Sequence, residues 1–243
     1  MYLTEPKFLD IVRQQFRFKM NANASAFTKL IFLQLACLFI SNYRQAAPGY
    51  NSIEVSEQLF SNTAIVVATW LWAFFVGLLL TIASQRNESF TFVTNRFSYH
   101  GSNFLFMLCA SIIGGLTAVL MGSVLKLYNL LQFENIIISS KGLFAAPADF
   151  FIQLMTAIAY TMLFFMVSYA IGMFIQRNKA FLLLFIVGWI TLSIIGGFSI
   201  IQPIFDFFWN EHSITIFLLK VSGTILGLFA IATAITNRLE VKK

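Results

Sequence analysis

Charged side chains are scarce in this sequence. Of its 243 residues, 11% are Asp, Glu, Lys or Arg, whereas 58% are hydrophobic, and the mean hydropathy is +0.79. A water-soluble domain of this size has no interior large enough to bury so much apolar surface. The composition therefore excludes a soluble domain and indicates an integral membrane protein.

Cysteine and proline are also few. The two cysteines, Cys37 and Cys109, fall inside apolar runs, which predicts packed, unreactive thiols and gives no support for a disulfide. Only four prolines are present, and apolar runs close to the roughly 20 residues that cross a bilayer recur along the chain. Several helices are therefore expected to span the membrane.

Catalytic motifs are missing as well. The chain has no Gly-x-x-x-x-Gly-Lys-Ser/Thr loop for a nucleotide, no His-Glu-x-x-His, no Gly-x-Ser-x-Gly and no Cys-x-x-Cys. Its two histidines, His100 and His212, fall on opposite predicted sides of the membrane and so do not share a metal. We expect no catalytic residue, no metal site and no cofactor bound by this chain.

The apolar runs hold no Asp or Glu away from their ends. A proton- or sodium-coupled carrier usually needs such a group at depth to load and release its ion. Lys126 and Lys220 lie near predicted outer ends, where their side chains reach the interface, and Gln34 and Gln153 are uncharged. No carbonyl filter or acidic ring of a channel stands out. An ion-coupled carrier or a channel is therefore disfavoured, although both stay open.

What the chain does have is the pattern of an all-α protein with six membrane-spanning helices. Their expected limits are Ala26–Ile40, Thr63–Ala83, Phe104–Leu125, Phe150–Ile175, Ala180–Ile201 and Ile214–Ile235. Most of the 16 basic residues fall on one predicted side: Lys7, Arg13, Arg17, Lys19, Lys29, Arg86, Arg96, Arg177, Lys179, Arg238, Lys242 and Lys243. The positive-inside rule places that side, and both termini, in the cytoplasm. The pI near 9.4 therefore reflects topology and gives little support to a nucleic-acid partner.

The N-terminal segment is not expected to be a cleaved signal, because Met1 to Asn23 has mixed charge and no apolar centre. Within it, Phe8, Val12, Phe16 and Met20 recur every four residues. Asp10, Arg13, Gln14 and Arg17 fall on another face. The pattern predicts a helix lying in the cytoplasmic membrane interface, with a solvated leader helix as the alternative.

Small residues repeat at four-residue spacing in the third apolar run, at Ala110, Gly114, Ala118 and Gly122. The sixth run has Gly223 and Gly227. Such a face lets helix backbones approach closely in lipid. Contact within one subunit is the more ordinary interpretation, and a dimer contact is the other.

The segment 198–209, FSIIQPIFDFFW, is apolar but interrupted by Pro203 and Asp206. It is too short to cross the membrane and too apolar to be fully solvated. We expect a re-entrant or interfacial pair of short helices on the outer side, with an ordinary loop as the alternative.

A cytoplasmic segment, NESFTFVTNRFSYHGSNF, lies between the second and third runs, in the loop 84–103. Its charged and aromatic residues are Glu88, Phe90, Phe92, Arg96, Phe97 and Tyr99. Aromatic and Arg anchors with charges beside them are typical of a protein contact. An amphipathic segment resting on the lipid surface is the alternative.

Together, these features resemble the ABC-2 type permease subunits of ATP-binding cassette exporters. The resemblance covers essentially the whole chain as one domain, 1–243, and its most specific part is a Glu-x-Phe-x-Phe-x-x-x-x-Arg pattern, met by Glu88, Phe90, Phe92 and Arg96. It implies a coupling helix that docks on a cytoplasmic ATPase, formed by Glu88, Phe90, Phe92, Asn95, Arg96, Phe97 and Tyr99. It also implies an interfacial elbow helix with Phe8, Val12, Arg13, Phe16 and Arg17. An outer gate with Phe198, Pro203, Phe205 and Phe208 is implied too.

The resemblance also implies partners. These are P-loop ATPase subunits that bind ATP and Mg, a second permease copy, identical or paralogous, and the lipids of the plasma membrane. The short outer loops favour a compact extruder of hydrophobic or amphipathic cargo, similar to Gram-positive exporters of peptide toxins, bacteriocins and phenol-soluble modulins. A non-transporting immunity protein stays open. A membrane enzyme would need a nucleophile and a base that the sequence does not offer.

Overall fold

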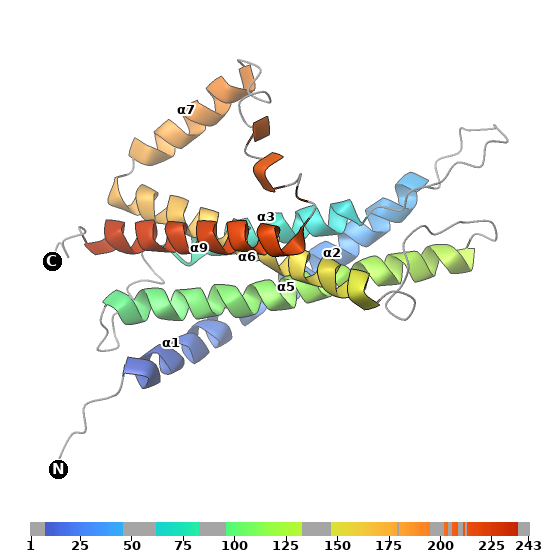
Figure 1. Cartoon of the computed structure of the whole chain (residues 1–243), viewed down its shortest axis with the longest axis horizontal. Helices are drawn as coiled ribbons and strands as arrows, with labels where there is room; N and C mark the ends of the chain where they lie inside the picture. Colours follow the sequence, from blue (N-terminus) through green and yellow to red (C-terminus); the bar gives the residue numbers. More distant parts are fainter. Residues whose placement is uncertain are drawn as a thin grey trace, which may run out of the picture.

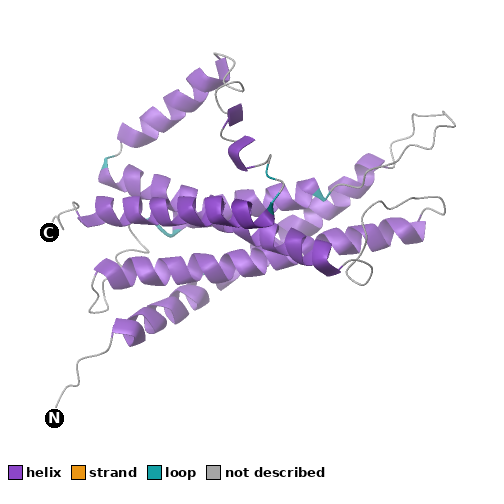
Figure 2. Ribbon diagram, viewed as in Figure 1, coloured by secondary structure: helices purple, strands orange, loops and turns teal. Residues whose placement is uncertain are grey.

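The structure is a computed structural model that describes residues 8–45, 62–82, 96–132, 147–178, 180–194, 202–203, 206–208, 211 and 213–237. Across these residues the regular structure is helical and contains no strand (Figure 2). The helices are α1 (Phe8–Ala22), α2 (Ala24–Gln45), α3 (Thr63–Leu79), α5 (Arg96–Gln132), α6 (Pro147–Arg177), α7 (Ala180–Ile194) and α9 (Ile214–Asn237) (Figure 1).

Four of the described helices are long and apolar enough to cross a membrane. The qualifying segments are Ala24–Ser41, Phe97–Tyr128, Pro147–Arg177 and Ile214–Ile235. α3 is apolar but has only 17 residues, and α7 has 15. The expected all-helical class is therefore confirmed, and these four segments coincide with four of the six spans expected from the sequence.

The core lies where α3, α5, α6 and α9 pack together. α6 occupies the centre, since it packs against each of the other three. Its largest buried side chains include Phe165 and Tyr169, and across from them Trp72 of α3 and Phe106 of α5 are also buried. The Trp72 and Phe165 rings meet edge to face at 5.5 Å, an arrangement that stabilises an aromatic pair beyond its buried area.

The small-residue face of α5 packs inside the subunit. A Cβ added at Gly115 would lie 2.9 Å from the backbone nitrogen of Ile158 on α6, so only glycine allows this approach. Gly114 faces Thr69 and Trp72 of α3 in ordinary contact. Small residues of α5 therefore pack against α3 and α6 of the same subunit, because they allow close backbone approach in helix packing.

α7 stands apart from the other helices (Figure 1). It is joined to α6 through Asn178, whose side-chain oxygen accepts a hydrogen bond from the Ala180 amide at 3.0 Å. Residues 181–187 are all exposed and apolar. A helix that is hydrophobic on every side needs an apolar surrounding, which a bilayer supplies.

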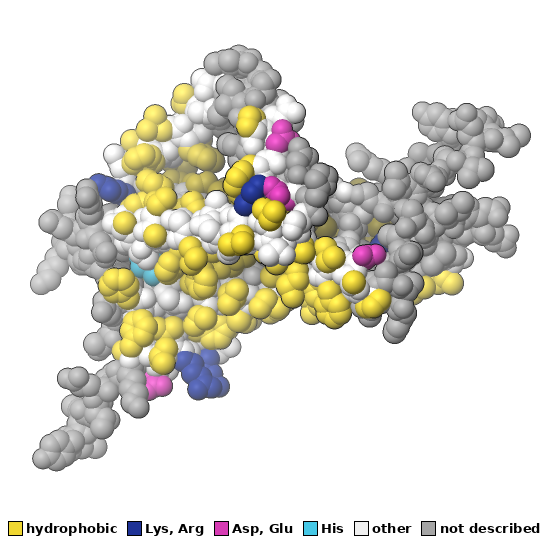
Figure 3. All heavy atoms as spheres, in the orientation of Figure 1, with side chains coloured by type: hydrophobic (Ala, Val, Ile, Leu, Met, Phe, Trp, Pro, Cys, Tyr) yellow, Lys and Arg dark blue, Asp and Glu magenta, His cyan; other side chains and the backbone are white. Residues whose placement is uncertain are grey.

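The surface of the bundle agrees with a lipid environment. Hydrophobic side chains cover much of the flank seen in Figure 3, and Lys and Arg side chains gather over α1 at the lower left. Large apolar side chains exposed at the surface include Leu131, Phe32 and Leu219. A continuous apolar patch on this scale is not tolerated on a soluble monomer.

Candidate functional site

The predicted coupling residues fall mostly outside the described residues. Glu88, Phe90, Phe92 and Asn95 lie there, and so does the side chain of Arg96, whose backbone begins α5.

The two remaining coupling residues differ in exposure. Phe97 is 60% exposed, whereas Tyr99 is 2% exposed. Any part that Tyr99 has in coupling therefore acts through contacts inside this chain, while Phe97 is available to a partner.

α5 begins eight residues earlier than the expected third span, at Arg96 instead of Phe104. The added turns are rich in polar side chains, and Ser98, His100, Ser102 and Asn103 are all buried. A sequence pattern that counts only apolar residues misses such turns. These turns stay helical because their polar side chains have hydrogen-bond partners on neighbouring helices.

These partners form an inner cluster, made of Lys19, Tyr99, His100, Ser102, Asn103 and Tyr169. Lys19 of α1 donates to Ser102 Oγ at 2.7 Å and also to Asn103 Oδ1 and the Tyr99 carbonyl oxygen. Its Nζ lies 4.5 Å from the centre of the Tyr99 ring, in a cation–π contact. One ammonium on α1 therefore binds three oxygens on the first turns of α5.

Tyr169 of α6 completes the inner cluster from the other side. Its hydroxyl accepts a hydrogen bond from Asn103 Nδ2 at 3.0 Å and lies 2.8 Å from His100 Nδ1. The donor in the contact with His100 depends on the imidazole tautomer, because the hydroxyl can either donate its own hydrogen or accept a second one. His100 Nε2 is buried and has no hydrogen-bond partner in the structure.

The inner cluster joins four helices at one end of the bundle. Tyr99 donates to the carbonyl oxygen of Leu80, just past the end of α3, at 3.2 Å, and the His100 ring lies 6.4 Å from that of Phe229 on α9. α1, the start of α5 and the last turns of α6 and α9 thus lie together, at the left of Figure 1.

Burial changes the acid–base behaviour of Lys19, which lies in α1, outside the helices long enough to span. Removal from water lowers the pKa of Lys19 to about 7, because the charged form loses its hydration. Its hydrogen-bond acceptors are neutral oxygens of α5, and no described salt bridge includes it. Lys19 therefore changes charge close to neutral pH.

The elbow prediction is partly visible in α1. The helix forms, with Arg13 and Arg17 exposed and Val12 buried, while Phe16 is half-buried and Phe8 is 50% exposed. The buried face of α1 is thus shifted toward the side that carries Lys19, because α5 offers that side polar partners.

Gln15, one turn before Lys19, is buried with both amide atoms unpaired. Sequence reasoning counted Lys19 only as a basic residue. The available signal was its spacing, since Lys19 follows Val12 by seven residues and Gln15 by four, which places all three on one helix face.

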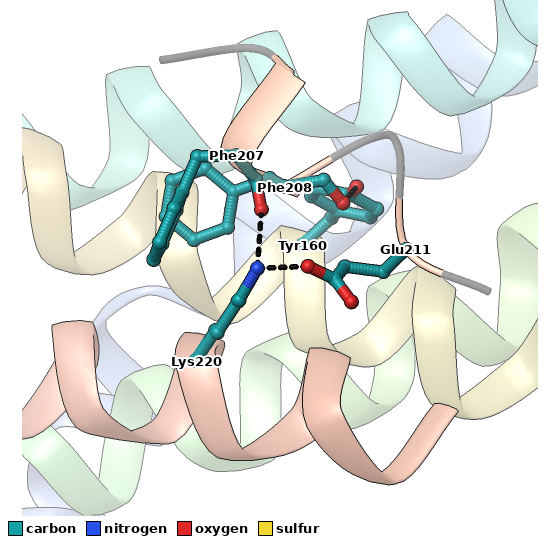
Figure 4. A network of polar contacts seen from close by, with 5 residues as sticks. All are labelled: Tyr160, Phe207, Phe208, Glu211 and Lys220. Carbon is teal, nitrogen blue, oxygen red and sulfur yellow. Dashed lines mark hydrogen bonds and ion pairs between the residues drawn. The ribbon is translucent and has the colours of Figure 1, made fainter. Parts of the chain in front are cut away.

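A second group of contacts, the outer cluster, lies at the opposite end of the bundle and consists of Tyr160, Phe207, Phe208, Glu211 and Lys220 (Figure 4). Lys220 of α9 forms an ion pair with Glu211, donates to the Phe207 carbonyl oxygen at 3.3 Å, and lies 4.3 Å from the centre of the Phe207 ring. Tyr160 of α6 donates to the Phe208 carbonyl oxygen at 3.0 Å. Phe208 is thereby held against α6, and Phe207 and Glu211 are held against α9.

Two of the predicted gate residues can be located. Phe208 belongs to the outer cluster and is half-buried, whereas Pro203 lies in a short exposed helical piece. Phe198 and Phe205 lie outside the described residues. Lys220 was interpreted from the sequence as reaching the interface; its partner Glu211 was missed because the two are nine residues apart, across the break between segment and helix.

A cavity of about 280 Å³ opens beside the outer cluster. Its walls come from α6, the segment ending at Glu211 and the start of α9: Ile152, Thr156, Tyr160, Phe208, Glu211, Ser213, Ile214 and Phe217. Among the described residues, no group of three or more His, Cys, Asp or Glu could hold a metal ion, there or elsewhere.

Comparisons of the chain with protein-family models, with curated proteins and with solved structures found no match. The ABC-2 relationship therefore stands as a resemblance of sequence pattern, and the function is proposed from the geometry of the two clusters.

Proposed function

We propose that the chain is the membrane-spanning subunit of an ATP-driven exporter in the plasma membrane. A separate cytoplasmic ATPase binds ATP and Mg, docks on the loop before α5, and moves the helices of this chain so that a hydrophobic or amphipathic substrate is extruded. The observation that carries this proposal is the inner cluster, which attaches α1 and α6 to the first turns of α5, directly after the predicted coupling residues.

The arrangement supports transmission of a force applied at the loop. Arg96 begins α5, and within two turns Lys19, Leu80 and Tyr169 connect this helix to α1, to the residue after α3 and to α6. Hydrogen bonds buried away from water are not readily exchanged for water, so these contacts favour joint movement of the helices. A pull on the start of α5 would thus reach α1 and α6 together.

The six-span topology belongs to this proposal. It counts α3 and α7 as two further spans, each lengthened by the neighbouring residues that the sequence assigns to the span. It also puts the inner cluster and both termini on the cytoplasmic side. The exposed basic residues of α1 and of the α6 end, Arg13, Arg17 and Arg177, lie on that side, as the positive-inside rule requires. A second permease copy would complete the substrate path.

Co-purification and vesicle transport test the proposal. The chain, extracted in mild detergent, is expected to bring down a P-loop ATPase, and ATP is expected to drive export from vesicles that contain both. Glu88→Ala and Arg96→Ala should leave membrane insertion intact but separate ATP hydrolysis from transport. Arg177→Ala, which removes an exposed charge from the same side, is the matched control. Transport that survives both loop substitutions would remove the docking role.

One observation favours a second candidate, a carrier that works without an ATPase. His100 is a buried ionisable group on the long apolar helix α5, and Lys19 of α1 is buried against the same turns; ionisable groups on membrane-spanning helices often mark an ion pathway. The pure chain in liposomes separates the two functions, because only the carrier moves substrate or protons without ATP and without a partner.

A further inference from the structure

The outer cluster already holds one ammonium group. The Nζ of Lys220 is bound by a carboxylate oxygen of Glu211, by the backbone carbonyl of Phe207 and by the face of the Phe207 ring. These are the three kinds of group that bind alkylammonium ions in proteins. Figure 4 shows the ion pair reaching one oxygen of Glu211, so the second carboxylate oxygen is not used by Lys220.

The adjoining cavity offers acceptors and apolar walls. Among the described residues that line it, Glu211 is the one with a charged side chain. Thr156 donates its hydroxyl hydrogen to the Ile152 carbonyl at 2.8 Å, and Tyr160 donates to the Phe208 carbonyl. Neither hydroxyl therefore has a hydrogen left for an incoming anion, whereas a group rich in donors finds a carboxylate. The carboxylate of Glu211 therefore favours a cation in the cavity by charge.

Its size and walls define the ligand further. A volume of about 280 Å³ lies below the range of pockets that enclose a whole drug-sized molecule, roughly 300–1,000 Å³, and suits a single side chain or head group. The Tyr160 and Phe217 rings, 5.0 Å apart, form apolar walls against which an alkyl stem packs. A primary ammonium on a flexible apolar stem meets all these conditions, since it has three donors and no acceptor.

We propose that this cavity binds a lysine side chain of a cationic amphipathic peptide, and that Lys220 is the internal occupant that competes with it for Glu211. This assignment rests on the proposed function for its meaning, because it names the exporter's substrate class, but binding itself needs neither ATP nor an ATPase. The peptide's ammonium binds the carboxylate of Glu211, its stem lies against Tyr160 and Phe217, and Lys220 is displaced toward Phe207.

Competition gives the two members of the ion pair opposite effects. Glu211→Gln removes the negative charge and should weaken binding about tenfold, the usual loss when a charged hydrogen bond is removed. Lys220→Met frees Glu211 and should strengthen binding. An ion pair that only stabilises the fold predicts the same direction for both substitutions, because each breaks the same contact.

The test uses the full chain in phosphatidylcholine nanodiscs without ATP. The probes are a fluorescent 18-residue Leu/Lys amphipathic helix and the same peptide with every lysine acetylated, which removes the charge and keeps the length. Fluorescence anisotropy gives the two affinities, and the wild type should prefer the amine form about tenfold over the acetylated one. Asp149→Asn and Lys126→Met are controls that change charge near the same side without touching the cavity, and both should bind as the wild type does.

Each outcome decides the assignment. An amine preference that is lost in Glu211→Gln and enlarged in Lys220→Met supports it, while equal or parallel shifts overturn it. If Glu211→Gln fails to fold, Glu211→Asp keeps the charge and is expected to retain the preference. Adding phosphatidylethanolamine to the nanodiscs distinguishes a lipid source of ammonium, since competition by that head group would overturn the peptide assignment.

The same materials separate this site from the proposed function. Glu211-dependent binding without ATP-driven transport in vesicles would leave the site standing and refute the exporter. ATP-driven transport of the peptide with no dependence on Glu211 would leave the exporter standing and refute the site.

Discussion

Replacing Lys19 by Met should abolish the pH dependence of the contact between α1 and α5. Met keeps most of the apolar stem but has no donor, so Asn103 Oδ1 loses its lysine partner in a buried setting. Leaving one buried acceptor unpaired costs about 1–3 kcal/mol. Ser102 loses less, because its hydroxyl still donates to the Tyr99 carbonyl at 2.9 Å.

The sign of the pH effect follows from the lowered pKa of Lys19. When α1 is detached, Lys19 meets water and keeps its proton up to its ordinary pKa of 10.5, whereas docked Lys19 releases it near pH 7. Between these values the detached state binds more protons, so docking becomes more favourable as pH rises. From pH 7 to pH 9 the gain is roughly 2 kcal/mol, at about 1.4 kcal/mol per pH unit once Lys19 is mostly neutral.

Spin labels can measure this equilibrium. One label replaces exposed Arg13 on α1 and the other replaces exposed Leu105 on α5, in a chain whose two cysteines are changed to alanine. Electron–electron distance measurements should show the long-distance fraction falling from pH 7 to pH 9 in the wild type. In Lys19→Met that fraction should be independent of pH, and at pH 7 it should be smaller than in the wild type, because burying the charged amine costs more there than losing its hydrogen bonds.

Lys29→Met is the matched control, because it removes an exposed lysine from the neighbouring helix α2. Its distance distributions should follow those of the wild type at every pH. A wild-type distribution that does not change with pH, or a Lys19→Met chain that keeps the change, would refute the assignment of this contact to the buried amine.

Two further predictions concern packing in the bundle. Tyr169→Phe removes a fully buried hydroxyl that accepts a hydrogen bond from Asn103 of α5, and it should lower the free energy of unfolding by about 1–3 kcal/mol. Tyr128→Phe, at an exposed position, is the control and should leave the stability almost unchanged in the same thermal unfolding assay in detergent. Gly115→Val places a side chain where the backbone of α6 lies, and the overpacking should lower the free energy of unfolding by about 1–3 kcal/mol or more. Gly223→Val is the control, because nothing lies within 4 Å of that position, and this variant should unfold at the wild-type temperature. Equal losses of stability at both glycines would contradict the described contact of α5 with α6.

Apolar run length predicted the helical class and the clearest spans, because a bilayer requires long apolar helices whatever their sequence details. Helix limits were less predictable. α5 extends back to Arg96 through serines, a histidine and an asparagine. Nothing in a hydropathy pattern indicates that Lys19 and Tyr169, which are 84 and 66 residues from Asn103 in the sequence, form hydrogen bonds with its side chain.

The two clusters differ in how much of each could be predicted from the sequence. The basic residues of α1 were visible as charges, but whether one of them is buried depends on the partner helix, which is a tertiary property. Likewise Lys220 was recognised near the outer end of its run, while its pairing with Glu211 depends on how the segment before α9 folds back. Periodicity identifies faces of helices, and only packing decides which polar group each face meets.

The continuity of α5 has a mechanical consequence. The helix runs for 37 residues without proline, about 55 Å at 1.5 Å per residue, and its adjacent glycines at positions 114 and 115 are packed against α3 and α6 and so give no hinge. A rod of that length converts a tilt of only about 5° at Arg96 into a displacement of about 5 Å at Gln132, by simple geometry from its helical rise. A small movement beside the inner cluster is thus enlarged to the width of a side chain on the far side of the membrane.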